Sequence, residues 1–211
     1  MPCYHPIIGW RSAVPNENGN YPILFNNNRK TILGPETKIP CGRCIGCRLE
    51  YSRQWAVRCV HESKMHSNNC FITLTYDDVH LPDDRSLHVE HFQRFMKRLR
   101  KKCGFVRFFH CGEYGENLGR PHYHAILFGL DFGDKRLFSR RDDINLYTSY
   151  DLSKLWTFGF STVGDCNFDT AAYCARYTLK KFRGSPEARE AHYGGRRPEY
   201  CTMSRRPGIV S

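Results

Sequence analysis

The sequence predicts an α+β fold, in which a central antiparallel sheet carries helices on its faces. Apolar side chains recur with helical spacing in residues 89–102 and 167–182. Residues 70–76, 105–113 and 122–130 are rich in β-branched and aromatic side chains, which favour strands. A Gly-rich connection, YGENLGRP, joins the last two strands and predicts an antiparallel hairpin with a long loop. Helices combined with a sheet built around a hairpin are typical of α+β domains.

The N-terminal segment, residues 1–48, is rich in proline, asparagine and cysteine. Because proline and asparagine favour turns, we expect an irregular arm packed on the body, with at most short strands near residues 23–25 and 31–33. A helix is expected from about residue 49 to residue 65, where apolar side chains recur at spacings of three and four. The main domain is expected to cover residues 49–185.

The second half of this domain is expected to alternate between short elements. Residues 131–148 are polar and charged, which predicts an excursion from the sheet. A short helix is expected at 149–159, a short strand at 160–165 and a longer helix at 167–182. Residues 186–211 contain many Gly, Pro and Arg residues, so we expect a basic, irregular C-terminal segment.

Charge and its distribution favour a nucleic-acid partner. The 211 residues carry a formal net charge of +11, and the stretch RFMKRLRKK, residues 94–102, holds six cations in nine positions. Clustered positive charge is typical of proteins that bind polyanions, nucleic acid first. An apolar stripe of Phe92, Phe95, Met96 and Leu99 marks the buried side of the same helix. The residues expected to contact DNA are Arg94, Lys97, Arg98, Lys101, Arg120 and Arg176.

The sequence predicts a cytosolic protein without a membrane partner. No stretch approaches the roughly 18 consecutive apolar residues of a membrane span, and the first residues, MPCYHPIIGW, lack the pattern of a signal peptide. In a reducing compartment the eleven cysteines are expected as free thiols or metal ligands rather than disulfides.

The stretch CGRCIGC places Cys41, Cys44 and Cys47 at Cys-x-x-Cys-x-x-Cys spacing. Three thiolates so close together can chelate Zn²⁺ in a structural site. We prefer Cys3 as the fourth ligand because it would pin the N-terminal arm to the body. An iron–sulfur cluster and plain reduced thiols are the alternatives. The other candidates for the fourth ligand are His5 and Cys59.

The stretch GRPHYHAILFG places two histidines at the start of an expected strand. Because side chains alternate along a strand, His122 and His124 point to one face, about 6.6 Å apart along the backbone. The same alternation on the neighbouring strand offers Glu113 as a third ligand. Two imidazoles and one carboxylate suit Mg²⁺, Mn²⁺ or Zn²⁺. Glu116 and His110 are weaker candidates, and the alternative is two histidines satisfied by hydrogen bonds at a sheet end.

The stretch AYCARYTLKKF places Tyr173 and Tyr177 four residues apart, on one face of the expected helix. Lys180 and Lys181 follow within the next turn. A tyrosine hydroxyl is a weak nucleophile at its ordinary pKa of about 10. Nearby cations favour the phenolate, and a metal can polarise the phosphate that it attacks. The alternative is an aromatic stripe packed in the core.

Taken together, these motifs resemble those of the HUH endonucleases of rolling-circle replication. FITLTY is similar to the first motif of that family, GRPHYHAILFG to its metal-binding second motif, and YCARYTLKK to its third. The paired tyrosines match the two-tyrosine branch. The blocks CGEYGENLGRPHYH and PCGRCIGCRLEYSRQW look like the replication initiators of microviruses, particularly gokushoviruses. The resemblance covers roughly residues 38–208 and implies a ferredoxin-like HUH architecture.

The resemblance implies a metal-dependent endonuclease and ligase that acts on single-stranded origin DNA. One tyrosine attacks the scissile phosphate, which leaves a 5′-phosphotyrosine link and a free 3′-hydroxyl that primes a host polymerase. The second tyrosine then releases a circle after one round. By motif, His122 and His124 bind Mg²⁺ or Mn²⁺, Tyr173 and Tyr177 are the nucleophiles, and Lys180 or Lys181 assists, while Glu113 rests on the hairpin geometry alone.

The resemblance also sets the expected surroundings of the protein. It implies action in the cytoplasm of a bacterial host. No G-x-x-x-x-G-K-[ST] phosphate loop occurs in the sequence, so strand separation is expected from a host helicase or from supercoiled DNA. Members of the family often run longer, so a nuclease-domain fragment is expected.

Two other functions fit parts of the pattern. A zinc-stabilised single-strand nucleic-acid-binding protein without catalysis would use the basic helix and the cysteines and leave the two histidines structural. A related HUH relaxase or transposase would use the same metal chemistry, but those enzymes often carry one tyrosine.

Overall fold

The computed structural model places most of the chain in two compact units, residues Met1–Tyr51 and Ser52–Ser211. The boundary lies close to the expected one after residue 48. Helix α1, Ile45–Lys64, begins in the first unit and ends in the second. The structure describes residues 3–26, 32–115, 118–141, 144–180 and 185–210, without the side chains of residues 32, 33, 141 and 177–180.

The first unit contains a three-stranded antiparallel sheet in the order β2-β1-β3. Its strands are β1, Ile7–Ser12, β2, Ile23–Leu24, and β3, Ile32–Ile39. The expectation of an irregular arm was therefore wrong. Prolines suggested irregular chain, but Pro22 precedes a strand and Pro35 lies in an edge strand, where a missing N–H is tolerated.

The second unit contains a seven-stranded antiparallel sheet in the order β10-β5-β6-β4-β9-β8-β7. This sheet and its helices confirm the predicted α+β class. The expected hairpin is β5 with β6, and β4 and β9 lie where strands were expected. The bounds are β4, Asn69–Thr75, β5, Arg107–Tyr114, β6, Pro121–Phe128, β7, Arg136–Arg141, β8, Ile144–Thr148, β9, Ser161–Asp165, and β10, Tyr200–Met203.

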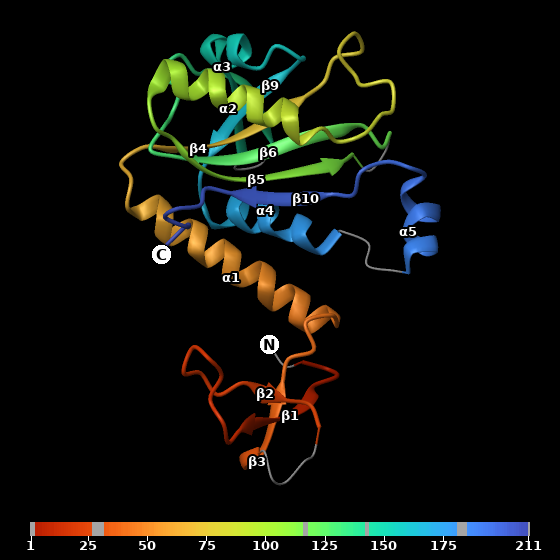
Figure 1. Ribbon diagram of the computed structural model, residues 1–211. Coiled ribbons are helices and arrows are strands. Elements are labelled where there is room, and N and C mark those ends of the chain that lie inside the picture. The colour runs from red at the N-terminus through yellow and green to blue at the C-terminus, as the bar shows by residue number, and fades with distance from the viewer. Residues whose placement is uncertain (1–2, 27–31, 116–117, 142–143, 181–184, 211) are drawn as a thin grey trace. The chain divides into compact units, whose positions relative to one another are not determined.

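Helices cover both faces of this sheet (Figure 1). Helices α2, Val89–Cys103, and α3, Tyr150–Leu155, pack on one face, where the predicted stripe of α2 is buried. Helix α4, Phe168–Lys180, packs on the other face against β5, β6 and β10. The two cores are separate clusters, so each face of the sheet presents its own set of side chains. Among the described residues no helix is long and apolar enough to cross a membrane.

Both edges of the sheet come from segments in which no strand was expected. Strands β7 and β8 form one edge within the polar residues 131–148. Strand β10 forms the other edge, preceded by helix α5, Pro186–Tyr193, so the expectation of an irregular C-terminal segment was also wrong. Edge strands are short and tolerate charged side chains on their exposed sides, which is why their sequences carry a weak strand signal.

A buried carboxylate on helix α1, that of Glu62, anchors the C-terminal residues of the second unit. Glu62 accepts hydrogen bonds from the backbone N–H of Val210 and from the guanidinium of Arg107, which also donates to the carbonyls of Pro207 and Gly208. Burial raises the pKa of Glu62, but the hydrogen bonds from Val210, Arg107 and His66 outweigh it, so the pKa lies below its ordinary value of 4.5.

Candidate metal and tyrosine sites

Strands β5 and β6 bring Glu113, His122 and His124 together at one end of the sheet. Glu113 lies directly opposite His122 in the antiparallel register, and His124 is two residues along the same face. The Nε2 atoms of both imidazoles lie 2.9 Å from the same oxygen, Oε1 of Glu113. The three side chains that alternation predicted therefore converge on one point and could hold a metal ion.

The outward nitrogen of each imidazole is fixed by a neighbour. Nδ1 of His122 lies 3.0 Å from the carbonyl oxygen of Arg120, which can only accept, so this nitrogen carries a proton. Nδ1 of His124 lies 2.9 Å from the hydroxyl of Thr73, its partner on strand β4. Partners on Nδ1 that turn Nε2 toward a common point are typical of metal-binding histidines.

The proton balance of this group also favours a cation. With a proton on Nδ1, neutral His122 has a lone pair on Nε2, and that lone pair faces a carboxylate oxygen that also bears lone pairs. A hydrogen bond between these two atoms would need one additional proton. A divalent cation bound between them would take the place of that proton. Glu113 is 2% exposed, so the charge of its carboxylate is poorly hydrated and needs a partner. The donor set fits Mg²⁺, Mn²⁺ or Zn²⁺.

The two weaker ligand candidates do not join this group. His110 points to the opposite face of the sheet, where it stacks on Phe92 with ring centroids 3.4 Å apart. Burial lowers the pKa of His110 well below its ordinary value, which is typical of a neutral core histidine. Glu116 lies outside the described residues.

Tyr173 reaches the same site from helix α4. The small buried residues Ala171, Cys174 and Ala175 let this helix lie close to the sheet. The Tyr173 hydroxyl donates to Oε1 of Glu113 at 3.4 Å, and its ring packs edge-on against His124, with centroids 5.1 Å apart. Tyr173 is 39% exposed, so part of its side chain is accessible from solvent.

The rest of the predicted tyrosine motif is only partly described. Tyr177 and Lys180 lie in helix α4, so the predicted helix is present, but their side chains are outside the described part of the chain. Lys181 lies outside the described residues altogether. Arg176, one of the cations expected to contact DNA, is exposed on this helix.

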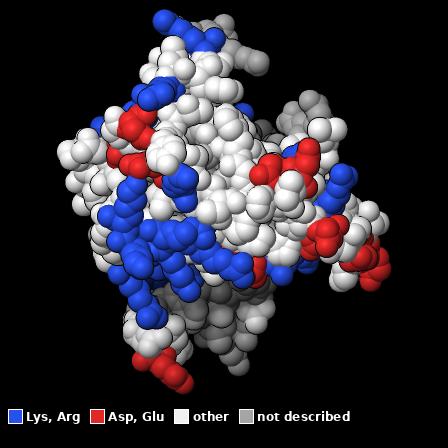
Figure 2. All heavy atoms as spheres, turned by 90° about the horizontal axis from the view of Figure 1, so that it is seen from above, with Lys and Arg blue, Asp and Glu red and all other residues white. Residues whose placement is uncertain are grey.

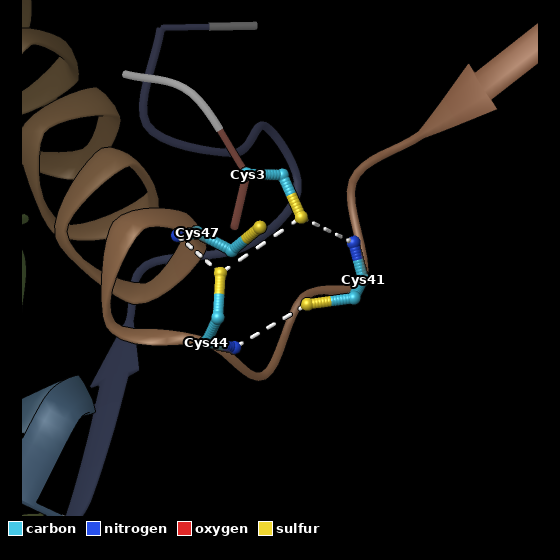
Figure 3. A group of neighbouring side chains, drawn as sticks. All are labelled: Cys3, Cys41, Cys44 and Cys47. Atoms are coloured by element: carbon cyan, nitrogen blue, oxygen red, sulfur yellow. Dashed lines mark hydrogen bonds between the residues drawn. The ribbon is translucent and has the colours of Figure 1, made fainter. Parts of the chain in front are cut away.

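A second candidate metal site lies in the first unit. The thiols of Cys3, Cys41, Cys44 and Cys47 converge, with all four sulfur atoms within 4.8 Å of one another (Figure 3). Strands β1 and β3 explain why Cys3 joins the motif. Ile7 pairs with Ile39, so the chain before β1 runs beside the chain after β3. His5 and Cys59 are not part of this group.

Backbone amides donate hydrogen bonds to three of these thiols. The N–H groups of Cys41, Cys44 and Cys47 donate to the sulfurs of Cys3, Cys41 and Cys44 respectively. Hydrogen bonds from the backbone of Cys47 and Tyr4 lower the pKa of Cys44 to about 6, whereas burial and the neighbouring Cys3 raise that of Cys47 to about 12. Four thiols this close cannot all ionise without a cation, and four thiolates suit tetrahedral Zn²⁺.

The cations expected on helix α2 lie on the face of the sheet opposite Tyr173. A patch of Lys and Arg side chains gathers on the α2 side of the molecule (Figure 2). Arg94, Lys97 and Lys101 are exposed there. Arg98 is half-buried, and its Nε donates to the carbonyl of Leu155, which gives it a structural role. Arg120 lies near the histidines and donates to the carboxylate of Asp78 at 2.6 Å.

Two residues of the histidine site were not expected from the sequence. Thr73 orients His124, and Phe71 stacks on the His124 ring with centroids 5.5 Å apart. Both lie on one face of β4, so alternation within FITLTY places them together. That β4 pairs with β6 is a non-local contact, which alternation alone does not predict.

Comparison with known proteins places the chain in a family. Residues 69–182 match the family model of the replication-associated protein ORF2/G2P. The chain is 37% identical over 203 residues to replication-associated protein VP4 of Bdellovibrio phage phiMH2K, and the match covers 91% of this chain and 62% of that protein. It is 38% identical over 170 residues to replication-associated protein ORF2 of Spiroplasma virus 4, covering 74% of this chain and 52% of that protein.

Replication-associated protein ORF4 of Chlamydia phage 1 is 34% identical over 155 residues, which cover 68% of this chain and 38% of that protein. The chain thus spans between about two fifths and three fifths of the length of these relatives. No solved structure was found to match the chain. The family match includes β4, β6 and α4, which carry Thr73, the two histidines and Tyr173. The resemblance to phage replication proteins is thereby confirmed, and the chain belongs to the family of replication-associated proteins of the ORF2/G2P type.

Proposed function

We propose that the chain cuts and rejoins single-stranded DNA at a replication origin through a covalent tyrosine–phosphate intermediate. The observation that carries this proposal is the position of the Tyr173 hydroxyl, 3.4 Å from the carboxylate oxygen on which His122 and His124 converge. A nucleophile beside a buried two-histidine, one-carboxylate group has the arrangement needed for metal-assisted phosphoryl transfer.

The reaction requires that the tyrosine oxygen replace the 3′ oxygen of the scissile phosphodiester. A bond forms between the Tyr173 oxygen and phosphorus, and the bond from phosphorus to the 3′ oxygen breaks. The phenolic proton is lost to a base, and the departing 3′ oxygen gains a proton to become a hydroxyl. Attack by a 3′-hydroxyl on the phosphotyrosine reverses these changes and rejoins the strand.

Each residue of the site would have a separate role in this reaction, set by its position. His122, His124 and Glu113 would hold Mg²⁺ or Mn²⁺, which supplies polarisation of a phosphate oxygen when bound. The Arg120 carbonyl and the Thr73 hydroxyl hold the two imidazoles in place. Tyr177, one helical turn after Tyr173, is proposed as the second nucleophile, and Lys180 or Lys181 would stabilise the phenolate or the phosphate.

The proposed surroundings follow from the relatives, which come from viruses of bacteria. We place the activity in the cytoplasm of a bacterial host, where a host helicase would separate strands and a host polymerase would extend the 3′-hydroxyl. The cysteine cluster is proposed to bind structural Zn²⁺, which would hold the first unit folded.

The test is the covalent adduct itself. The protein is incubated with Mn²⁺ or Mg²⁺ and a randomised pool of single-stranded oligonucleotides labelled at the 3′ end. Because the cut leaves the 5′ phosphate on tyrosine, the label stays with the protein on a denaturing gel. We expect an adduct that is absent with EDTA and strongly reduced in Tyr173→Phe. Binding of the pool without any adduct would instead favour a non-catalytic single-strand-binding protein.

A further inference from the structure

A cavity of about 660 Å³ opens near the edge of the seven-stranded sheet, between strand β9, helix α3 and the β7–β8 hairpin. Sites for small molecules commonly have volumes of roughly 300–1,000 Å³. The residues that matter for its chemistry are Arg136, Tyr150, Ser153, Phe160 and Ser161, all of which line it. None of these residues belongs to the tyrosine and histidine site.

Ser161, one of the residues that line this cavity, carries an unsatisfied hydroxyl. Ser161 is 4% exposed, and its Oγ atom has no hydrogen-bond partner among the described residues. A buried hydroxyl without a partner costs free energy, and a ligand that supplies a donor or an acceptor would recover it. The acid groups nearby are already engaged, since Asp134 accepts from Ser149 and from the backbone of Asp151, and Asp151 pairs with Lys102.

Exposed aromatic rings stand beside the cavity. Tyr150 and Phe160 are 69% and 47% exposed, although both are large and carry much apolar surface. Phe160 also lies against Phe138, itself 58% exposed, with ring centroids 5.1 Å apart. Exposed rings next to a cation such as Arg136 are typical of surfaces that stack the bases of single-stranded nucleic acid.

The cavity lies at the same end of the sheet as the proposed nicking site. The carbonyl of Phe160 accepts from the backbone N–H of Thr75 at 2.9 Å and from its hydroxyl at 3.0 Å. Thr75 is in turn the direct partner of His122 across strands β4 and β6. Phe160 is therefore about two strand spacings, roughly 10 Å, from His122.

A glycine makes this close approach possible. Gly159, with φ of 146°, packs against the backbone of Thr75, Tyr76 and Asp77, and a side chain there would collide with it. Only glycine adopts such a backbone conformation readily. Gly159 thus fixes the position of Phe160 beside the end of β4.

We propose that this cavity binds one nucleotide of the strand being cut, a short distance along that strand from the scissile phosphate. The base stacks on the ring of Phe160 or Tyr150 and hydrogen-bonds to Ser161, while Arg136 contacts a phosphate. This inference rests on the proposed function. It adds a base-binding subsite that would orient the strand across the sheet end toward Tyr173.

The experiment combines crosslinking with affinity. A randomised single-stranded pool containing 5-iododeoxyuridine is irradiated with the protein, and the crosslinked peptides are identified by mass spectrometry. We expect adducts at Tyr150 or Phe160. At least one of the Phe160→Leu and Tyr150→Ala variants should bind the same pool at least about five-fold more weakly, the loss expected for one stacked base.

The matched control is Leu137→Ala, which removes an exposed apolar side chain from the same edge of the sheet without touching the cavity. We expect its affinity to be unchanged. Crosslinks found only elsewhere, or unchanged affinity in both cavity variants, would overturn the subsite. Failure of the proposed function looks different, because the wild-type protein would then form no phosphotyrosine adduct even though its crosslinks at the cavity persisted.

Discussion

The hydroxyl of Tyr173 lies 3.4 Å from Oε1 of Glu113, and that one oxygen is also 2.9 Å from each of the imidazoles of His122 and His124. The β5–β6 hairpin and the distant helix α4 meet at this atom. A carboxylate so placed links the proposed nucleophile to the proposed metal ligands. Its charge should therefore matter more than its shape.

Replacing Glu113 by Gln tests that charge. The amide keeps the size of the side chain but removes its negative charge, so we expect at least about tenfold weaker Mn²⁺ binding by calorimetry. Glu90→Gln is the matched control, because Glu90 is an exposed acid on α2, outside the group of Glu113, His122 and His124. If Glu113→Gln binds Mn²⁺ as the wild type does, Glu113 is not a ligand.

The cysteine cluster should hold one Zn²⁺ per chain. We expect Cys44→Ser to lower the zinc content measured by elemental analysis and to make the first unit sensitive to proteolysis, because four thiols without a cation repel one another when ionised. Cys103→Ser is the control, since Cys103 is an exposed free thiol outside the cluster. Equal zinc content in the two variants would contradict the assignment.

The cations of helix α2 should have two different roles, contact with DNA phosphates and support of the fold. Lys97 and Lys101 are exposed, so replacing either by Gln should reduce the slope of log affinity against log salt by about 0.7 for single-stranded DNA if each contacts one phosphate. Arg98→Gln should leave that slope unchanged but lower the free energy of unfolding by about 1–3 kcal/mol, because the carbonyl of Leu155 loses its donor. Two measurements distinguish these roles: the salt dependence of DNA affinity, and the free energy of unfolding in urea.

The free energy of unfolding should fall at acid pH because the Glu62 carboxylate becomes protonated. Its pKa in the folded protein lies below the ordinary value of 4.5, so the folded state favours the carboxylate. The stabilisation is therefore present above about pH 4.5 and is lost as the pH falls through the lowered pKa. Glu62→Gln should cost about 2 kcal/mol near neutral pH and flatten this dependence in urea unfolding. Glu190→Gln, at an exposed position on α5, should leave both unchanged.

Sequence patterns predicted the elements that have one strongly apolar side. Helix α2 carries its apolar stripe and α4 its tyrosines at regular helical spacing, and the β5–β6 hairpin joins neighbouring segments. The missed strands, β1, β7, β8 and β10, lie in segments rich in proline or charge. Strands β7 and β10 lie at exposed edges of their sheet, and β1 pairs with strands distant in the sequence. Local sequence patterns are weak in both situations.

In the candidate sites too, local sequence patterns predicted some residues, and the others depend on pairing between distant strands. The convergence of Glu113 on the two histidines follows from alternation across one hairpin, which the sequence contains. Thr73 joins the site only because β4 pairs with β6, and Cys3 lies near Cys41 only because β1 pairs with β3. The cations of α2 were expected to contact DNA, but which face of the sheet α2 covers depends on the topology of the whole second unit.

The most direct test of the account is the identity of the residue that carries the DNA. The adduct formed with Mn²⁺ is digested with protease and nuclease, and the modified peptide is sequenced by mass spectrometry. The account predicts a phosphotyrosine at Tyr173 in the wild-type protein, a residual adduct at Tyr177 in Tyr173→Phe, and none in the double variant. A covalent link at any other residue, or an adduct that survives the double variant, would contradict it.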